Sequence, residues 1–388
     1  MHSTRVVGRF TRTRFDSRAE LTEACRSAQV STFPDTCMPQ SRRYLLISLG
    51  LALIVIVAWL SLRSTTPVVP EAIKHGYSEA LSAARAGQPG AARQLYQQLG
   101  RPDLSVKRRV WLHAELPNYP SPQALKLADA DLQSEAADVR LAAIKSVVGL
   151  VPGGQRSLLL GPLLDDEDQS VRFAAINALL GLTPDELGLY FAPLEQAIDG
   201  WEQVLKEQPP SAATYAQLAR LHLHNAELKQ AQDALENTLR LEPGNLPALV
   251  MQIDVLDRQG QSDAARQLLA QQLKAQPDSA YLQHALGLWL LHHDQLEFAL
   301  LGLSKAVELE PDNKDYRYDL ATTLHSAEEL EAAQNQLQEI VQRHPADRKA
   351  RVLLINYWKE SGQLQNVQVL LAQLEQLNPD DPALQQGL

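Results

Sequence analysis

Residues 280–313 read AYLQHALGLWLLHHDQLEFALLGLSKAVELEPDN, and this stretch contains the pattern that decides the fold. It holds two helical runs rich in Leu and Ala, which are strong helix formers. The second run stops at Pro311, because proline cannot continue a helix. The polar residues after Pro311 provide an N-cap for a new helix. The stretch therefore predicts a pair of helices followed by the start of the next pair.

The same pattern recurs every 34 residues, which is the mark of a repeat architecture. The prolines that end each unit are Pro209, Pro243, Pro277, Pro311, Pro345 and Pro379. Units counted from residues 212, 246, 280, 314 and 348 also share small residues at the place where two helices of a unit meet. These residues are Ala231, Ala265, Ala299 and Ala333, with Val367 in the last unit. The spacing predicts an all-α solenoid over residues 189–388.

The 34-residue units resemble the tetratricopeptide repeat, and the resemblance covers residues 212–381. It implies paired helices whose first members line a concave groove that binds proteins. Ile253, Ile355 and Val367 are bulkier than the repeat pattern prefers. We therefore expect the second and fifth units to pack less tightly than the others.

A second repeat precedes these units. Residues 138–150 read DVRLAAIKSVVGL, and residues 170–182 read SVRFAAINALLGL, 32 residues later. The Val-Arg and Ala-Ala phrases resemble a HEAT repeat, and a weaker copy begins at Val106. The resemblance implies about three HEAT-like helix pairs over residues 75–188, with a buried valine stripe. It also implies that each arginine binds an acidic turn of the neighbouring unit.

The order of the two repeat types is similar to the C-terminal half of a family of exported multihaem cytochrome-like proteins. That family carries a haem domain before its HEAT and tetratricopeptide repeats. This chain has no Cys-x-x-Cys-His motif, so the resemblance implies a shared scaffold and compartment without electron transfer. We expect no cofactor.

Residues 44–62 read YLLISLGLALIVIVAWLSL and contain no charged residue. The run is just long enough to cross a hydrocarbon core of about 30 Å. Residues 1–43 carry eight Arg against four acidic residues, so the positive-inside rule places them in the cytoplasm. Residues 63–74 read as a linker. The sequence thus predicts a single-pass protein of the bacterial inner membrane with a periplasmic C-terminal domain. A cleaved signal peptide is the alternative, but no small-x-small site follows the run.

Translation starts at Met1 or at Met38, and the compact MPQSRR that begins at Met38 makes residues 1–37 a candidate for an untranslated stretch. The two cysteines, Cys25 and Cys37, both precede the apolar run. The rest of the chain therefore offers no disulfide framework and no thiolate metal site.

No motif of enzyme chemistry is present: the chain lacks a Gly-rich phosphate loop, a nucleophile elbow and a metalloprotease signature. The formal net charge of −10 argues against nucleic acid as a partner. The acidic run at residues 165–168 lacks calcium-loop spacing, and we interpret it as a capped turn before a helix. We therefore expect a protein that is not an enzyme and holds no metal.

The second, fifth, ninth and twelfth places of a tetratricopeptide unit face its groove, and the thirteenth lies at the lip. The residues at these places that we consider candidates for binding a partner are Arg220, His224, Asp254, Asp257, Tyr281, His284, His292, Tyr318, His325, Asn356 and Lys359. Aromatic and basic side chains are good anchors for a partner. A solvated helix face is the alternative for each of them.

The sequence favours a membrane-tethered scaffold whose groove recruits envelope proteins. An accessory, docking or assembly factor for c-type cytochromes is the alternative, suggested by the family resemblance alone. The last full helix carries Leu364, Val367, Leu370, Leu371 and Leu374 with only a stub after it. We therefore expect the C-terminal helices to dock on a partner or on a second copy of the chain.

Overall fold

The structure is a computed structural model that describes residues 76–385, and every regular element in that range is helical. The chain divides into two units, Met1–Ile73 and Lys74–Leu388. The predicted basic tail, membrane segment and linker lie outside the described residues. Among the described residues, no helix combines the length and the apolar character needed to cross a membrane.

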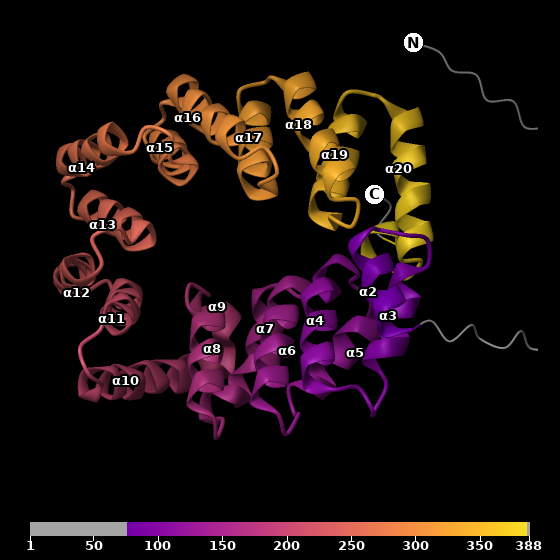
Figure 1. Cartoon of the computed structure of the whole chain (residues 1–388), viewed down its shortest axis with the longest axis horizontal. Helices are drawn as coiled ribbons and strands as arrows, with labels where there is room; N and C mark the ends of the chain where they lie inside the picture. The colour runs from indigo at the N-terminus through magenta and orange to yellow at the C-terminus, as the bar shows by residue number, and fades with distance from the viewer. Residues whose placement is uncertain (1–75, 386–388) are drawn as a thin grey trace, which may run out of the picture. The chain divides into compact units, whose positions relative to one another are not determined.

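Helix pairs fill residues 77–187 (Figure 1), and four pairs stand where about three were predicted. They are α2 (Tyr77–Arg85) and α3 (Ala91–Leu99), α4 (Val106–Glu115) and α5 (Pro122–Asp131), α6 (Ala137–Leu150) and α7 (Gly153–Leu160), and α8 (Gln169–Leu179) and α9 (Pro184–Leu187). Short 3-10 helices lie between or after them: η1 (Leu116–Asn118), η2 (Gly161–Asp165) and η3 (Gly188–Tyr190).

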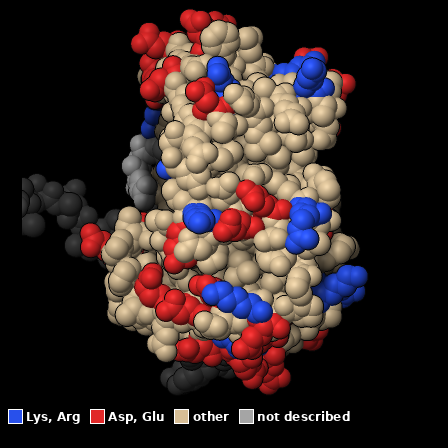
Figure 2. All heavy atoms as spheres, turned by 90° about the vertical axis from the view of Figure 1, so that its left-hand side faces the viewer, with Lys and Arg blue, Asp and Glu red and all other residues tan. Residues whose placement is uncertain are grey.

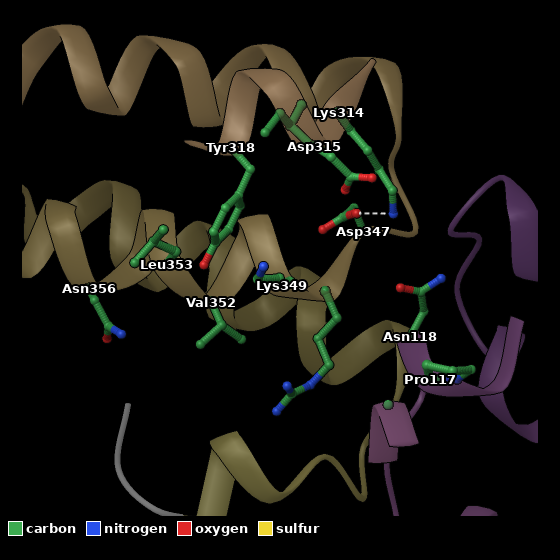
Figure 3. Close-up of a pocket in the computed structure, with 13 residues that line it drawn as sticks. Pro117, Asn118, Lys314, Asp315, Tyr318, Asp347, Lys349, Val352, Leu353 and Asn356 are labelled. Carbon is green, nitrogen blue, oxygen red and sulfur yellow. Dashed lines mark hydrogen bonds and ion pairs between the residues drawn. The ribbon is translucent and has the colours of Figure 1, made fainter. Parts of the chain in front are cut away.

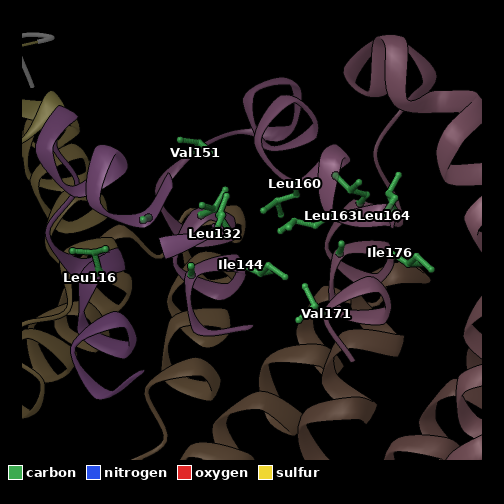
Figure 4. Close-up of a cluster of buried hydrophobic side chains, with 14 of the residues drawn as sticks. Leu116, Leu132, Ile144, Val151, Leu160, Leu163, Leu164, Val171 and Ile176 are labelled. Atoms are coloured by element: carbon green, nitrogen blue, oxygen red, sulfur yellow. The ribbon is translucent and has the colours of Figure 1, made fainter. Parts of the chain in front are cut away.

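Apolar side chains of successive pairs meet in one continuous core (Figure 4). Leu116, Leu132, Ile144, Leu160 and Ile176 are all buried in it. Each leucine or isoleucine of this kind stabilises the fold by about 1.5–3 kcal/mol. Because neighbouring pairs supply adjacent parts of this core, each pair depends on the next one for its stability.

Of the two arginines in the Val-Arg phrases, Arg140 ties one pair to the next, whereas Arg172 donates to the Asp166 and Glu167 carbonyls in the turn before its own helix. Arg140 donates from Nη2 to Oδ1 of Asp166 at 2.8 Å and from Nη1 to the Ser134 carbonyl at 2.7 Å. Asp168 accepts hydrogen bonds from the backbone N–H groups of Ser170 and Val171 and caps α8. The acidic run is thus the capped turn predicted from the sequence.

A long helix, α10 (Phe191–Glu207), leads into five helix pairs. They are α11 (Ala212–His224) and α12 (Leu228–Leu241), α13 (Leu246–Arg258) and α14 (Ser262–Ala275), α15 (Ala280–His292) and α16 (Leu296–Leu309), α17 (Lys314–Ser326) and α18 (Leu330–Arg343), and α19 (Arg348–Glu360) and α20 (Leu364–Leu377). The short α21 (Pro382–Gln385) follows. Each first helix begins at the residue predicted from the proline spacing.

N-caps in the same register explain why each first helix starts where it does. The side chain of the preceding residue accepts a hydrogen bond from a backbone N–H of the first turn. The five capping residues are Ser211, Asn245, Ser279, Asn313 and Asp347. Loss of such a cap typically costs about 1 kcal/mol.

Small residues set how closely the helices of a unit approach. A Cβ on Gly287 of α15 would lie 2.6 Å from Leu303 Cγ of α16, and one on Gly302 would lie 3.0 Å from the backbone nitrogen of Gly287. The helices of the second and fifth units touch each other less extensively than those of the other three. This difference confirms the prediction made from the bulky residues Ile253 and Ile355.

The two ends of the helix array meet within the unit Lys74–Leu388. Asn378 Nδ2 donates to the Pro120 carbonyl at 2.7 Å, and the Gly90 N–H donates to the Gln376 carbonyl at 2.7 Å. Leu377 belongs to the core cluster that includes the N-terminal helix pairs. A Cβ on Gly87 would lie 2.6 Å from the carbonyl oxygen of Pro345, so these two turns are also in close contact.

We expected the C-terminal helices to dock on a partner or a second copy because the sequence offers only a short stub to cover the apolar side chains of the last full helix. The structure shows that most of these side chains are buried. Val367, Leu370, Leu374 and Leu377 of α20 are buried within the same chain. Leu364 remains exposed. The expectation of an uncovered final helix was wrong, because Val367 and Leu370 pack against α17–α19 and because Leu377 and Asn378 contact the N-terminal pairs.

Candidate partner-binding groove

The first helices of the five units, α11, α13, α15, α17 and α19, lie on the inner side of their arc (Figure 1). We call the surface that they line the inner groove. The fixed register places the same positions of each helix on this surface. Two cavities lie along it, one at α17 and α19 and one at α13 and α15.

The first cavity has a volume of about 480 Å³ and is lined from both ends of the helix array (Figure 3). Tyr318 of α17 and Asn356 of α19, both predicted groove residues, line it together with Lys349. Pro117 and Asn118 line it from the turn that follows α4. The contact between the two ends of the array therefore completes this cavity.

Most charges in this cavity are neutralised by neighbours. Lys314 Nζ donates to Asp347 Oδ2 at 2.6 Å, and Arg348 donates to both carboxylate oxygens of Asp381 at 2.6 and 2.7 Å. Lys349 forms no ion pair within residues 76–385, and its Nζ lies 3.7 Å from the centre of the Tyr318 ring.

The Tyr318 phenol is partly buried. Burial, followed by the negative charges of Asp347 and Asp319, raises the pKa of Tyr318. The hydroxyl therefore stays protonated at neutral pH and can donate a hydrogen bond. The cavity thus presents an ammonium group, a phenol and the Asn356 amide beside the apolar side chains of Val352 and Leu353.

The second cavity, of about 190 Å³, lies between α13 and α15 and has mainly apolar walls. The predicted residues Asp254, Asp257 and His292 line it, together with Leu288 and Trp289. The indole Nε1 of Trp289 is buried and has no hydrogen-bond partner among the described residues.

The carboxylates of the second cavity have partners of their own. Asp254 binds Arg258 of the next helical turn at 2.9 Å, and Asp257 binds Nε2 of His293 at 2.7 Å. Burial alone would raise the pKa of Asp257, but hydrogen bonds from Ser262 and His293 outweigh it and hold the pKa below its usual value. Asp257 is therefore a carboxylate at neutral pH.

Three of the four predicted histidines lie beside carboxylates of other helices, whereas His292 contacts the ring of His293. His284 Nε2 lies 2.8 Å from Asp319 Oδ2. His325 Nε2 lies 2.6 Å from Glu360 Oε2.

The remaining pair, His224 and Glu195, is longer, at 3.4 Å. The His325 ring also stacks on Tyr357 with centroids 4.1 Å apart. Within residues 76–385, no group of three or more His, Cys, Asp or Glu side chains is placed to hold a metal ion. His284 and His325 each join one repeat to the next through their carboxylate partners.

The other predicted residues lie apart from the two cavities. Arg220 is exposed, and Tyr281 and Lys359 are partly buried. Burial raises the pKa of Tyr281. The structure thus collects Tyr318 and Asn356 at one cavity and Asp254, Asp257 and His292 at the other.

Several lining residues were missed by sequence reasoning. Lys349 occupies the second place of its unit, so the repeat count could have found it. Pro117 and Asn118 could not be found this way, because they belong to the other end of the array and carry no repeat signal.

The charged surface on the side of α12–α14 is mixed (Figure 2). Lys and Arg side chains are scattered among Asp and Glu there, and they form no continuous basic area on that face. This face therefore lacks the broad positive surface typical of nucleic-acid binding.

Known family models match parts of the second half of the chain. Two family models, each described as tetratricopeptide repeat, match residues 227–288 and residues 299–387. These residues are tetratricopeptide repeats. Such repeats form scaffolds that bind other proteins, and this assignment agrees with the helix pairs, their register and the inner groove.

A curated relative is "Uncharacterized protein y4yS" of Sinorhizobium fredii (strain NBRC 101917 / NGR234), 31% identical over 101 residues. The match covers 26% of this chain and 56% of the relative, so the chain spans just over half of that relative's length.

Solved structures with similarity include MamA (17% identity, TM-score 0.35, 43% of this chain and 91% of that one). YrrB, described as a tetratricopeptide repeat protein with an unusual peptide-binding site, matches at 20% identity with a TM-score of 0.33, over 49% of this chain and 97% of that one. PilF of Pseudomonas aeruginosa matches at 22% identity with a TM-score of 0.35, over 51% of this chain and 90% of that one.

Proposed function

We propose that this protein is a membrane-tethered scaffold that holds partner proteins of the bacterial envelope in its inner groove. The observation that carries the proposal is the cavity at α17 and α19. There the Lys349 ammonium, the Tyr318 phenol and the Asn356 amide line one space of about 480 Å³. These groups suit a protein segment that offers hydrogen-bond acceptors beside an apolar side chain.

The helical framework supports binding with little loss of freedom. Stacked helix pairs hold the groove residues in place before a partner arrives, so few side chains have to be ordered on binding. Tyr318 already rests against Lys349, and the Asp381 carboxylate fixes Arg348. A partner therefore meets a preorganised surface, and tyrosine side chains are among those that contribute most to binding energy in protein interfaces.

The tether in this proposal is the apolar run at residues 44–62. Its length and the arginines before it support a single crossing, with the N-terminus in the cytoplasm and the repeats in the periplasm. The HEAT-like interpretation of residues 75–188 belongs to the same proposal, and the Arg140–Asp166 pair supports it. These helix pairs complete the cavity by supplying Pro117 and Asn118.

The test is chemical crosslinking in intact cells, followed by purification of the tagged full chain from membranes and identification of its partners. A Tyr318→Ala/Asn356→Ala variant should lose a defined set of envelope proteins. An Asp233→Ala/Glu236→Ala variant should retain them, because both side chains are exposed on α12 outside the groove.

Equal recovery with both variants would contradict binding at this cavity. Cytochromes among the captured proteins, recognised by haem absorbance, would support the accessory function. Recovery of the protein from the soluble fraction of lysed cells would contradict the tether.

A further inference from the structure

A second surface, on α4 and α6, is basic and apolar at once. We call it the α4–α6 surface. Its centre is a cavity of about 590 Å³ with mostly apolar walls. The residues that line it are Val106, Lys107, Val110, Ala114, Asp138, Leu141, Ala142 and Lys145.

Large apolar side chains are exposed at this surface. Trp111 is 45% exposed and Val106 is 42% exposed, although both belong to a helix whose opposite side is buried. Lys107 Nζ lies 5.9 Å from the centre of the Trp111 ring, and Arg85 Cζ lies 5.6 Å from it. Tryptophan with cations around it is favoured at a bilayer interface, where its apolar ring and polar N–H are both satisfied.

Positive charges at this surface are largely unpaired. Lys107, Arg108 and Lys145 are exposed, and none forms an ion pair within residues 76–385. The acidic side chains here are Asp138, which lines the cavity, and Glu115, which is bound to Arg85 at 2.8 Å. The surface therefore carries a positive excess on a chain whose net charge is −10.

The surface also lies next to the point where the chain enters the described unit. Arg108 Cζ is 5.1 Å from the centre of the ring of Tyr77, the first residue of α2. Residues 63–75 separate this point from the apolar run. A chain of 13 residues spans at most about 45 Å when fully extended.

We propose that the α4–α6 surface binds the headgroups of anionic phospholipids and holds the helix array against the membrane. Lys107, Arg108 and Lys145 contact phosphates, and Trp111 and Val106 enter the interfacial layer. The closeness to the bilayer rests on the tether of the proposed function. The lipid-binding chemistry rests on the residues of the surface alone.

The membrane is favoured over an acidic protein as the occupant for two reasons. An exposed tryptophan beside lysines with long apolar stems suits the graded polarity of the interface. The apolar run also ends only 13 residues before the described unit, so the proposed tether keeps this surface within about 45 Å of the bilayer.

The test uses residues 74–388, which form a compact unit of their own and need no tether to reach a vesicle. Far-UV circular dichroism first verifies that this fragment and its variants are helical. Co-sedimentation is then measured with vesicles of phosphatidylcholine alone and with vesicles that also contain phosphatidylglycerol. We expect binding only to the second kind, and we expect added salt to weaken it.

The matched variants are Lys107→Gln/Lys145→Gln at the surface and Lys229→Gln/Lys274→Gln on α12 and α14. Both remove two exposed lysines, so the net charge changes equally. We expect the first to lower vesicle partitioning about 30-fold, the effect of two basic residues near an anionic surface. The second should change it little. Brominated lipids should quench fluorescence in the wild type more than in Trp111→Phe.

Absence of binding to phosphatidylglycerol vesicles, or equal loss with both lysine pairs, would overturn the proposal. The proposal would also be overturned if Lys107→Gln/Lys145→Gln left vesicle binding unchanged but abolished crosslinking of an acidic protein to the full chain. The surface would then be a protein contact. These outcomes are independent of the inner groove. Capture of groove partners by the full chain is tested separately with the Tyr318→Ala/Asn356→Ala variant.

Discussion

In each of the five helix pairs from α11 to α20, one residue of the turn between the two helices has a left-handed backbone. These residues recur at the 34-residue spacing and are Ala226, Gly260, Asp294, Glu328 and Gly362, with φ of 56°, 76°, 57°, 63° and 74°. For a residue with a Cβ, this conformation costs roughly 1–2 kcal/mol relative to the right-handed one. Glycine adopts it without that cost.

Replacement of Glu328 by glycine should therefore stabilise the protein. We expect a gain of up to about 1 kcal/mol in the free energy of unfolding, measured by denaturant titration. Gly260→Ala provides the opposite change in an equivalent turn and should destabilise it, because no neighbour within 4 Å obstructs the new Cβ and only the backbone is strained. Destabilisation by Glu328→Gly would contradict the assignment of strain to this turn.

Asp131 is the centre of a mostly buried polar cluster in the first half of the array. Arg109 Nη1 donates to it at 2.8 Å, and His113 Nε2 lies 2.8 Å from it. Burial alone would raise the pKa of Asp131, but the hydrogen bonds with His113 and Arg109 prevail and lower it below 3.8. The charged Asp131 carboxylate therefore stabilises the fold fully above its unfolded-state pKa. This stabilisation is lost as the pH falls through the lower pKa that Asp131 has in the folded state.

Asp131→Asn should lower the free energy of unfolding by about 3 kcal/mol at neutral pH, because it leaves Arg109 without its buried partner. The difference from the wild type should begin to shrink below about pH 4, where Asp131 becomes protonated in the unfolded chain, and should shrink further as the pH falls through its lower folded-state pKa. Denaturant titrations across this pH range measure both effects. Asp103→Asn is the control, since its partner Arg101 is at the surface, and it should change stability little. A difference that does not change with pH would contradict the role given to the carboxylate.

At the scale of single residues, sequence reasoning succeeded where the physical cause is local. A proline ends a helix and a Ser, Asn or Asp caps the start of one through contacts with neighbouring residues, so these signals do not depend on distant parts of the chain. The partners of His284 and His325 were not predictable in this way. Each pairs with a carboxylate 35 residues away, so the side chain that ties two repeats together looked like a free groove residue.

Among the helices, the contact between the two ends of the array is the feature that the sequence pattern did not predict. A repeat pattern describes neighbours, whereas Asn378 and Pro120 are 258 residues apart. The curvature that brings them together accumulates from small rotations at every interface between repeats. The expectation of an exposed C-terminal helix failed for this reason.

Asn378→Ala should loosen this contact. It removes the bond from Nδ2 and leaves the Pro120 carbonyl without that partner, at a cost of about 1–3 kcal/mol. The Gly90 N–H, which donates to Gln376 across the same contact, should then exchange with deuterium at least about fivefold faster. Asn237→Ala serves as the control, because that amide bonds only within its own helix and its neighbours on α12. Unchanged exchange at Gly90 would contradict a closure that depends on Asn378.

On the scale of the whole molecule, the sequence predicted the class of fold and the start of every tetratricopeptide unit, but only part of the candidate site. Tyr318 and Asn356 were found by counting within the repeat. Asn118 reaches the same cavity only because the array closes on itself. The sequence therefore predicted which face of the helices is the groove, and the long-range contact determined where along that face a complete cavity forms.

The central claim is that proteins bind in the inner groove at α17 and α19. The most direct measurement is photo-crosslinking in intact cells from a photoreactive amino acid placed at residue 349, compared with one placed at residue 233 on α12. We predict that residue 349 crosslinks to a small, reproducible set of envelope proteins and that residue 233 does not. Crosslinking of the same proteins from both positions, or from neither, would contradict the claim.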